Sequence, residues 1–224
     1  MKLLILRPEP GASRTAARAG AIGLEPIVAP LFEIIAMTGP PVEAGRFEAV
    51  LLTSANGARN APAGLTALPC FAVGESTAAA AGAAGFVDVR TGPCDGSAAA
   101  AMMAAAGVKR ALHPCGLDHL AVGAEGVAIE RRIVYSAEPV PHERFEGPAV
   151  AMIHSARAGA RFAQLAGDRT AIAVAAISRA AAAAAGEGWA AKAVAEEPRD
   201  QALLELAAKL CNHGFDVVRD GNGI

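Results

Sequence analysis

Small and hydroxyl-bearing residues follow four apolar segments of this sequence, and they are its strongest candidates for ligand binding. The four turns are Thr53–Asn56, Gly74–Thr77, Ser155–Arg157 and Ile177–Arg179. Each turn precedes an alanine-rich stretch, so it would place free N–H groups or a hydroxyl at the start of a helix. Groups of this kind can hold an anionic ligand. The serines could also act only as helix N-caps, but four turns in matched positions favour a shared ligand.

The matched positions come from an internal repeat, in which one half of the sequence resembles the other. The segment Ala49–Arg59 is similar to Ala149–Arg161, and Phe71–Ala78 is similar to Ala175–Ala180. Each repeated segment predicts a strand, a sharp turn and a helix. The carboxyl edge of a parallel sheet is where α/β proteins bind their ligands. We therefore expect the four turns to face one cleft between two similar lobes.

Short apolar runs alternate with alanine-rich stretches along the chain, which is typical of an α/β fold with mainly parallel strands. Alanine favours helix, and a last helix is expected near Asp200–Cys211. The predicted strands are Lys2–Arg7, Glu25–Pro30, Ala49–Thr53, Cys70–Val73, Phe86–Val89, Val108–His113, Val127–Glu130, Ala149–Ile153, Ala171–Ala175 and Ala190–Ala195.

The grouping of these strands predicts a discontinuous lobe with a second lobe inserted into it. The first two and last three strands would share one sheet, and the five middle strands would form the other. The chain must then cross twice, and Leu31–Met37 and Arg131–Val140 are extended segments flanked by proline that could pair as a hinge-like β ladder. The predicted boundaries are residues 1–34 with 141–224, residues 38–130, and a ladder of residues 31–37 and 131–140.

The overall charge argues against nucleic acid as a partner. The formal net charge is −2, whereas neutralising phosphates requires a basic surface. No window approaches the roughly 18 unbroken apolar residues of a membrane span. The apolar start of the chain is interrupted at once by Arg7, Pro8 and Glu9, so a signal peptide is not expected. We predict a cytoplasmic protein without a membrane partner, acting as a monomer.

The cysteines and histidines do not predict a metal site. Cys70, Cys94, Cys115 and Cys211 form no CxxC pair and match no zinc pattern. They are expected to be reduced, mostly buried thiols. The five histidines lack metal-ligand spacing, and at least four of them are expected at the surface.

The turns and their neighbours resemble the uroporphyrinogen-III synthase family, in the same order and over nearly the whole chain. The similar segments are the opening Ile5–Pro8, the Thr-Ser-Ala-Asn turn of Leu52–Asn56 and the Ala-Val-Gly-x-x-Thr-Ala turn of Ala72–Ala78. A Val-Tyr pair on the second crossing, Val134–Tyr135, and a hydroxyl turn at His154–Ser155 complete the pattern.

The sequence departs from the family pattern at two places. Ser178 stands where the family usually has glycine, and Ala180–Ala181 replaces the following Thr-Ala pair. The stretch His113–Leu120 reads His-Pro-Cys-Gly-Leu-Asp-His-Leu where the family usually has an Arg-Gly-rich segment. These differences affect which groups of the two segments would contact a substrate.

The resemblance implies both a fold and an activity. The fold would consist of two Rossmann-like or flavodoxin-like lobes joined by a β ladder. The enzyme would be a hydro-lyase that removes water from hydroxymethylbilane, inverts ring D and closes the macrocycle to uroporphyrinogen III in haem and tetrapyrrole biosynthesis. The family uses no metal and no organic cofactor, so none is expected here. Because closure without the enzyme occurs without inversion, catalysis would consist mainly of orienting the substrate.

The resemblance also assigns roles to residues. Tyr135, the only tyrosine of the chain, would donate a proton or a hydrogen bond to the departing hydroxyl; alternatively, it is a packed interface tyrosine. Arg7 would pair with a substrate carboxylate, or it is an exposed surface charge. The predicted substrate-binding residues are Arg7, Thr53, Ser54, Ala55, Asn56, Gly74, Glu75, Ser76, Thr77, Ser155, Ala156, Arg157, Ser178 and Arg179.

Two other functions remain as alternatives. A nucleotide-dependent α/β enzyme would need a GxGxxG or P-loop turn, and the sequence contains neither. A two-lobed binding protein for an anionic small molecule, without enzymatic activity, would use the same turns. The isomer formed from hydroxymethylbilane distinguishes the synthase from the binding protein.

Overall fold

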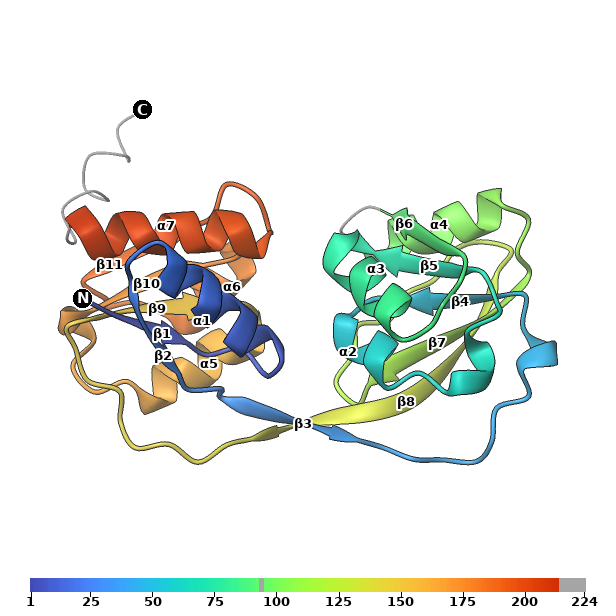
Figure 1. The fold of residues 1–224 in the computed structure, drawn as a ribbon, viewed down its shortest axis with the longest axis horizontal. Helices are drawn as coiled ribbons and strands as arrows, with labels where there is room; N and C mark the ends of the chain where they lie inside the picture. Colours follow the sequence, from blue (N-terminus) through green and yellow to red (C-terminus); the bar gives the residue numbers. More distant parts are fainter. Residues whose placement is uncertain (93–94, 214–224) are drawn as a thin grey trace. The chain divides into compact units, whose positions relative to one another are not determined.

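The computed structural model describes residues 1–92 and 95–213, and the chain divides into two compact units (Figure 1). Unit 1 comprises Met1–Glu33 and Pro139–Ile224, and unit 2 comprises Ile34–Glu138. Cys94 lies outside the described residues. Within the described part of the chain, no helix combines the length and the hydropathy that crossing a bilayer requires.

The sheet of unit 1 is parallel throughout, and its strands come from both ends of the chain (Figure 1). Its order is β11-β10-β9-β1-β2. Leu3, Ile5 and Met152 pack with α1 and α7 on one face, while α5 and α6 cover the other. The elements of unit 1 are β1 (Lys2–Ile5), α1 (Gly11–Ala21), β2 (Glu25–Val28), β9 (Ala149–Ile153), α5 (Ala156–Leu165), η3 (Arg169–Ala171), β10 (Ile172–Ala176), α6 (Arg179–Ala185), β11 (Ala191–Val194) and α7 (Asp200–His213).

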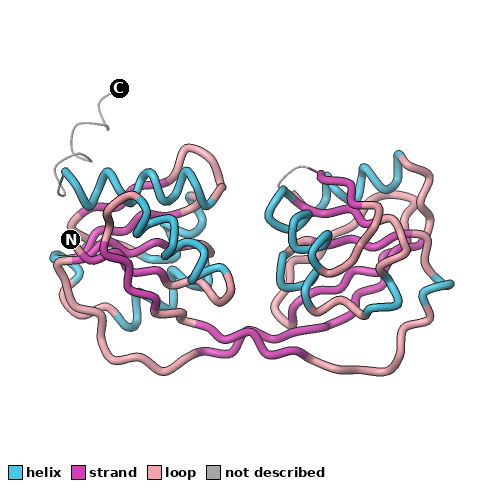
Figure 2. Tube along the Cα trace, in the orientation of Figure 1, coloured by secondary structure: helices cyan, strands magenta, loops and turns pink. Residues whose placement is uncertain are grey.

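The sheet of unit 2 has the order β3-β8-β7-β4-β5-β6. Figure 2 draws the strands of both sheets in magenta and the helices that cover them in cyan. Successive residues of β4 point to opposite faces: Val50 and Leu52 pack with α2 and α3, whereas Ala49 and Leu51 pack with α4. The elements of this sheet and its helices are β3 (Phe32–Ala36), η1 (Ala44–Arg46), β4 (Ala49–Leu52), α2 (Ala55–Arg59), η2 (Ala63–Leu65), β5 (Cys70–Val73), α3 (Gly74–Ala83), β6 (Val89–Gly92), α4 (Gly96–Ala105), β7 (Arg110–Gly116) and β8 (Ala128–Pro139).

Strands β3 and β8 form the ladder expected of the two crossing segments. The N–H of Met37 donates to the carbonyl of Val134 (2.8 Å), and the N–H of Val140 donates to the carbonyl of Leu31 (3.0 Å), so the two strands run antiparallel. The predicted strand Val127–Glu130 does not end before this ladder, because it continues into it as β8. The predicted fold class, two mainly parallel α/β sheets joined by a β ladder, is confirmed.

The strand predicted at Phe86–Val89 is wrong, because β6 begins only at Val89. Gly85, with φ of 96°, ends α3 in a left-handed conformation that favours glycine. The N–H of Phe86 then donates to the carbonyl of Ala81 (3.1 Å), which is a Schellman cap. Phe86 is buried as the apolar residue that closes this cap, so its hydrophobicity reports the end of a helix and not a strand.

Helices α5 and α6 contact each other closely at Gly159. A Cβ at this position would lie 2.6 Å from the carbonyl oxygen of Ala181 and 3.0 Å from the backbone nitrogen of Ala185. The two helix starts carry Ser155 and Ser178, so this contact fixes the spacing of two predicted site residues.

Replacement of Gly159 by alanine is therefore expected to destabilise unit 1. The added methyl group would clash with the backbone of α6, and such overpacking costs about 1–3 kcal/mol. Urea unfolding of the wild type and of Gly159→Ala measures this loss.

Gly20→Ala in α1 is the matched control, because a Cβ at Gly20 meets no atom within 4 Å. Alanine favours a helix over glycine by about 0.5–1 kcal/mol, so the control should be at least as stable as the wild type. Equal effects of the two substitutions would contradict the helix contact.

Candidate functional site

The turn after β4 presents two hydroxyl groups at the carboxyl edge of the unit 2 sheet. Ser54 is the N-cap of α2, and its Oγ accepts a hydrogen bond from the N–H of Gly57 (2.9 Å). Thr53 Oγ1 lies 3.0 Å from Nε2 of His113, which belongs to the neighbouring strand β7. Ser54 therefore has the capping role that sequence analysis left open. Its oxygen also has a second partner, the hydroxyl of Tyr135.

The phenol of Tyr135 lies 3.2 Å from Oγ of Ser54. Tyr135 is on β8, and Ser54 follows β4, so the phenol reaches across the intervening strand β7. The register of β7 and β8 shifts between Cys115 and Gly116, which places Tyr135 opposite Gly116. A β-bulge of this kind redirects a side chain.

Gly116 allows the phenol ring to cross β7. A Cβ at Gly116 would lie 2.7 Å from Cζ of Tyr135 and 2.9 Å from its hydroxyl oxygen. Any side chain at this position would displace the ring from where it lies. Tyr135 is thus held by a glycine beneath its ring and by a serine at its hydroxyl, and it is not merely a tyrosine with its hydroxyl in water.

His113 is fully buried beside the hydroxyl of Thr53, at 0% exposure. Burial, with contributions from the nearby charges of His119 and Arg131, lowers the pKa of His113 to about 4. The ring is therefore neutral near neutral pH. Nδ1 of His119 donates to the Gly116 carbonyl (3.0 Å), and its Nε2 accepts from Nη1 of Arg131 (3.0 Å).

The expectation that at least four histidines are surface groups is wrong. His113 is buried, and His119, His142 and His154 are each partly buried with a hydrogen-bond partner. The stretch that departs from the family pattern thus supplies two histidines to the neighbourhood of Thr53 and Tyr135. The strand pairing of β4 and β7 brings them there.

The turn after β5 differs from its repeat after β10. Gly74, with φ of 72°, is the first residue of α3, and this helix start has no side-chain cap. In the repeat, Ser178 has extended backbone and caps α6 by accepting from the N–H of Ala181 (3.2 Å). Consequently the Gly74 turn leaves backbone N–H groups for a ligand, whereas the Ser178 turn uses one of them internally.

The remaining residues of the turns in unit 2 differ in exposure. Thr77 is buried at 5% exposure, so its side chain faces the packing of α3. Glu75 and Ser76 are exposed, and Ala55, the first residue of α2, is partly buried. Asn56 is partly buried and accepts a hydrogen bond from Arg59 (2.9 Å).

The turn after β9 separates His154 from Ser155. Ser155 Oγ accepts from the N–H of Ala158 (3.1 Å) at the start of α5, whereas Nε2 of His154 lies 2.7 Å from Oδ1 of Asp200. Burial, with a contribution from the charge of Arg7, lowers the pKa of His154 to about 3. The pair has no nucleophile–base geometry, as expected for adjacent residues of a strand.

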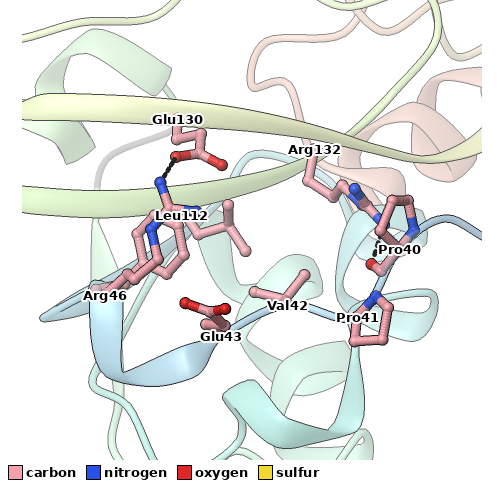
Figure 3. A pocket seen from close by; sticks show the side chains of 9 residues that line it. Pro40, Pro41, Val42, Glu43, Arg46, Leu112, Glu130 and Arg132 are labelled. Atoms are coloured by element: carbon pink, nitrogen blue, oxygen red, sulfur yellow. Dashed lines mark hydrogen bonds and ion pairs between the residues drawn. The ribbon is translucent and has the colours of Figure 1, made fainter.

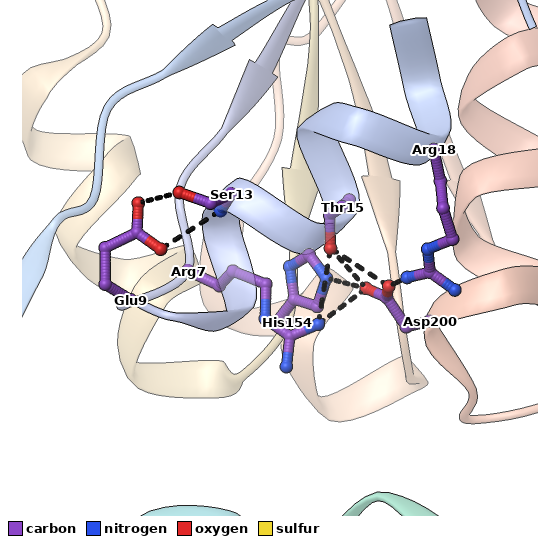
Figure 4. A network of polar contacts seen from close by, with 7 residues as sticks. All are labelled: Arg7, Glu9, Ser13, Thr15, Arg18, His154 and Asp200. Atoms are coloured by element: carbon purple, nitrogen blue, oxygen red, sulfur yellow. Dashed lines mark hydrogen bonds and ion pairs between the residues drawn. The ribbon is translucent and has the colours of Figure 1, made fainter. Parts of the chain in front are cut away.

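Asp200, the first residue of α7, is the centre of a polar cluster in unit 1 (Figure 4). Its carboxylate accepts from Nη1 of Arg7 (2.7 Å) and from the hydroxyl of Thr15 (3.0 Å), and it forms an ion pair with Arg18. Burial and the charge of Arg14 lower the pKa of Arg7. Arg7 is thus a partly buried, oriented cation and not an exposed surface charge. Arg7 and Arg18 together carry two positive charges and Asp200 carries one negative charge, so these three residues have a net charge of +1.

The other two predicted arginines are at the surface of unit 1. Arg157, in α5 after Ala156, places its guanidinium 4.4 Å from the ring centre of Phe32, which is a cation–π geometry. Arg179, the first residue of α6, is exposed.

A pocket of about 200 Å³ in unit 2 does not coincide with these residues (Figure 3). Proline and oppositely charged residues line it, including the Arg46–Glu130 ion pair at 3.0 Å. Arg132 donates there to the carbonyl of Pro40. None of the predicted site residues is among its lining residues, so we do not assign the ligand to it.

Metal ligation finds no support in the described residues, because they contain no group of three or more candidate ligands. Cys70, Cys115 and Cys211 are free thiols. Burial, with a contribution from Asp88, raises the pKa of Cys70 to about 12, so this thiol is unreactive.

Sequence reasoning missed His113 and Asp200. For His113, the available signal was its place at the end of an apolar run. The predicted strand that it ends is the neighbour of the predicted strand that ends at Thr53. For Asp200, the sequence shows only an acid at a helix start, which is a common stabilising feature. Its contact with Arg7 spans 193 positions and depends on the packing of α7 against the sheet.

The family model described as HEM4, uroporphyrinogen-III synthase HemD, matches residues 13–205 of the chain. The chain is similar in structure to uroporphyrinogen-III synthetase from Helicobacter pylori 26695, with a TM-score of 0.64, 16% identity and coverage of 93% of this chain and 98% of that chain. It is also similar to a mutant uroporphyrinogen III synthase from the extremely thermophilic bacterium Thermus thermophilus, with a TM-score of 0.52, 16% identity and coverage of 95% and 99%. No curated protein matches the sequence.

At these identities the solved structures show the fold, and the family model carries the assignment. Its match extends over most of the chain and includes both repeats and the β ladder. The chain belongs to the uroporphyrinogen-III synthase family, whose role lies in haem and tetrapyrrole biosynthesis.

Proposed function

We propose that this chain closes hydroxymethylbilane to uroporphyrinogen III, with Tyr135 as the residue that acts on the departing hydroxyl. The contact between the phenol of Tyr135 and Ser54 Oγ carries this proposal (3.2 Å). It places the only phenol of the chain at the carboxyl edge of a parallel sheet, beside the turn that the family resemblance singled out.

The first step removes water. The phenol donates its proton to the hydroxyl of hydroxymethylbilane as the C–O bond breaks, and the pyrrole nitrogen lone pair forms the cationic azafulvene. The hydroxyl of Ser54 then donates a hydrogen bond to the phenolate oxygen and stabilises its charge.

The substituted α-carbon of ring D attacks the azafulvene and forms a spiro intermediate. The bond between that carbon and the methylene bridge to ring C then breaks, and the bridge bonds to the other α-carbon of ring D, so that the ring is inverted. This α-carbon releases its hydrogen as a proton, which restores the aromatic pyrrole and the phenol. Hydroxymethylbilane is thus converted to uroporphyrinogen III and one water.

The acetate and propionate groups of the substrate require anion-binding groups. In unit 2, the uncapped N–H groups at the start of α3 and the hydroxyl of Thr53 support this role. In unit 1, the cationic excess at Arg7 and Arg18 around Asp200 supports it. We propose that groups of both kinds bind carboxylates of the substrate. Holding these carboxylates would orient ring D for inversion.

Two further expectations are part of this proposal. Free, buried thiols at Cys70 and Cys115 support a reducing compartment such as the cytoplasm. The sheets of both units are covered by helices of the same chain, which supports a monomer.

The isomer formed from hydroxymethylbilane tests the proposed function. The purified chain is incubated with freshly prepared substrate, and the products are oxidised and resolved as porphyrin isomers. Formation of more moles of isomer III than moles of enzyme supports the synthase, because it shows turnover. Isomer I alone, together with saturable binding of the substrate, would instead establish a binding protein without chemistry.

Tyr135→Phe is expected to lower the rate of isomer III formation by about a hundredfold, because it removes a general acid. The ring still fits over Gly116, so the melting temperature should change little. A steady-state assay of isomer III measures the loss. A variant with wild-type turnover would exclude the phenol from the mechanism.

Gly116→Ala is expected to abolish most activity, although it replaces no residue that acts on the substrate. The new methyl group would displace the Tyr135 ring, which lies 2.7 Å from the position of that Cβ. Gly123→Ala is the matched control, since a Cβ at Gly123 meets no atom within 4 Å. Isomer III assays of both variants decide the point, and equal activity of the two would refute the arrangement.

The stability of the chain should fall between pH 6.5 and about 4, partly through His113. The folded-state pKa lies below the unfolded value, so the unfolded state binds more protons in this range. The stability that the neutral imidazole of His113 contributes is complete above its unfolded-state pKa. This stability decreases by up to about 3 kcal/mol as the pH falls through the folded-state pKa. Urea unfolding at several pH values should give a shallower decline for His113→Gln than for the wild type. Parallel curves would contradict the buried neutral imidazole.

A further inference from the structure

We infer that His113 is a positioning residue, which donates its Nε2–H to Thr53 and thereby directs the Thr53 hydroxyl proton toward the substrate. This inference rests on the proposed function and deepens it, because it assigns a role to a residue that the family resemblance did not supply. The contact between Nε2 of His113 and Oγ1 of Thr53, 3.0 Å, is the starting observation.

The surroundings of His113 decide which ring nitrogen carries the proton. Nδ1 is buried and has no hydrogen-bond partner among the described residues, whereas Nε2 contacts Thr53. A buried N–H without an acceptor costs more than a buried lone pair without a donor, and orphaned N–H groups are rare in proteins. A neutral ring therefore keeps its proton on Nε2 and leaves the lone pair on Nδ1.

The charges around the ring agree with a single proton. Strand pairing places Arg131 opposite His113, and the ring of His119 lies edge-on with centroids 6.5 Å apart. A second proton on His113 would be buried next to the cationic Arg131. The neighbouring positions from β4 and from α2 contribute Thr53 and apolar side chains, which offer no compensating carboxylate.

This arrangement determines the direction of the Thr53 hydroxyl. Oγ1 accepts from His113, so the hydroxyl hydrogen cannot also lie along that contact. Thr53 is partly exposed at the carboxyl edge of the sheet, and it has no further side-chain partner among the described residues. Its hydrogen is therefore available to an acceptor oxygen, which a substrate carboxylate provides. With the opposite tautomer, Thr53 would donate to His113 and present only lone pairs, which repel a carboxylate.

Ring-nitrogen NMR of the isotope-labelled wild-type chain tests the tautomer directly. A long-range proton–nitrogen correlation distinguishes the protonated from the unprotonated nitrogen, and His113→Gln assigns the signal by its disappearance. His154 is the internal reference, because the carboxylate of Asp200 can only accept from its Nε2. We expect His113 to show a protonated Nε2 and an unprotonated Nδ1 near neutral pH. A protonated Nδ1 would overturn the inference.

A double-mutant cycle tests the consequence for the reaction. His113→Leu should lower kcat/KM for isomer III by about tenfold, mainly through KM, since it weakens binding of a substrate carboxylate. In a Thr53→Ala background the same change should lower kcat/KM by less than about twofold, because the residue through which it acts is absent. His113→Gln should restore most of the loss, as its amide N–H replaces Nε2–H.

His142→Leu is the matched control, since His142 bonds a backbone carbonyl in unit 1 and lies outside the site (2.9 Å to Pro30). An equal loss from His113→Leu in both backgrounds would show a structural effect and overturn the inference. Should His113→Leu not fold, the wild-type spectrum and His113→Gln still decide it. If the wild type makes only isomer I, the proposed function fails, while the tautomer result stands or falls separately.

Discussion

The passage of the Tyr135 ring over Gly116 is the constraint on which the candidate site depends. The parallel order of β8, β7 and β4 sets the spacing between a side chain on β8 and the turn after β4. A bulge turns Tyr135 toward that turn, and a missing side chain on β7 leaves room for its ring. The phenol then meets Ser54, whose oxygen is itself fixed by capping α2. Each contact is modest in free energy, but together they give one orientation for the group that acts on the substrate.

The two repeats have kept the same framework and diverged in chemistry. In unit 2, hydroxyl groups and a neutral histidine surround the strand ends, at Thr53, Ser54 and His113. In unit 1, the corresponding edge is charged, with Arg7 and Arg18 bound to Asp200. The difference between the Gly74 and Ser178 turns follows the same division, since only the first leaves its helix start uncapped.

The sequence predicted the strands and helices well where local patterns determine them, as in Ala49–Leu52 and Ala149–Ile153. It also predicted the two sheets joined by a ladder, because an inserted lobe makes the chain cross twice and both crossing segments are extended and flanked by proline. It misplaced β6, since an apolar residue that closes a helix cap looks like the start of a strand. It missed His113 because strand order sets its partner. It missed Asp200 because the packing of α7 on the sheet brings it to Arg7. The register shift that aims Tyr135 leaves no local sequence signal.

Tyr135 is the only tyrosine of the chain, so a label on its phenol carbon reports on this residue alone. Carbon NMR of the labelled chain, titrated with uroporphyrinogen III, tests the central claim most directly. If the phenol of Tyr135 lies at the reacting part of the bound molecule, its single resonance must shift and saturate with the ligand. A chain that forms isomer III and binds this product, while the Tyr135 resonance stays in place, would contradict the account.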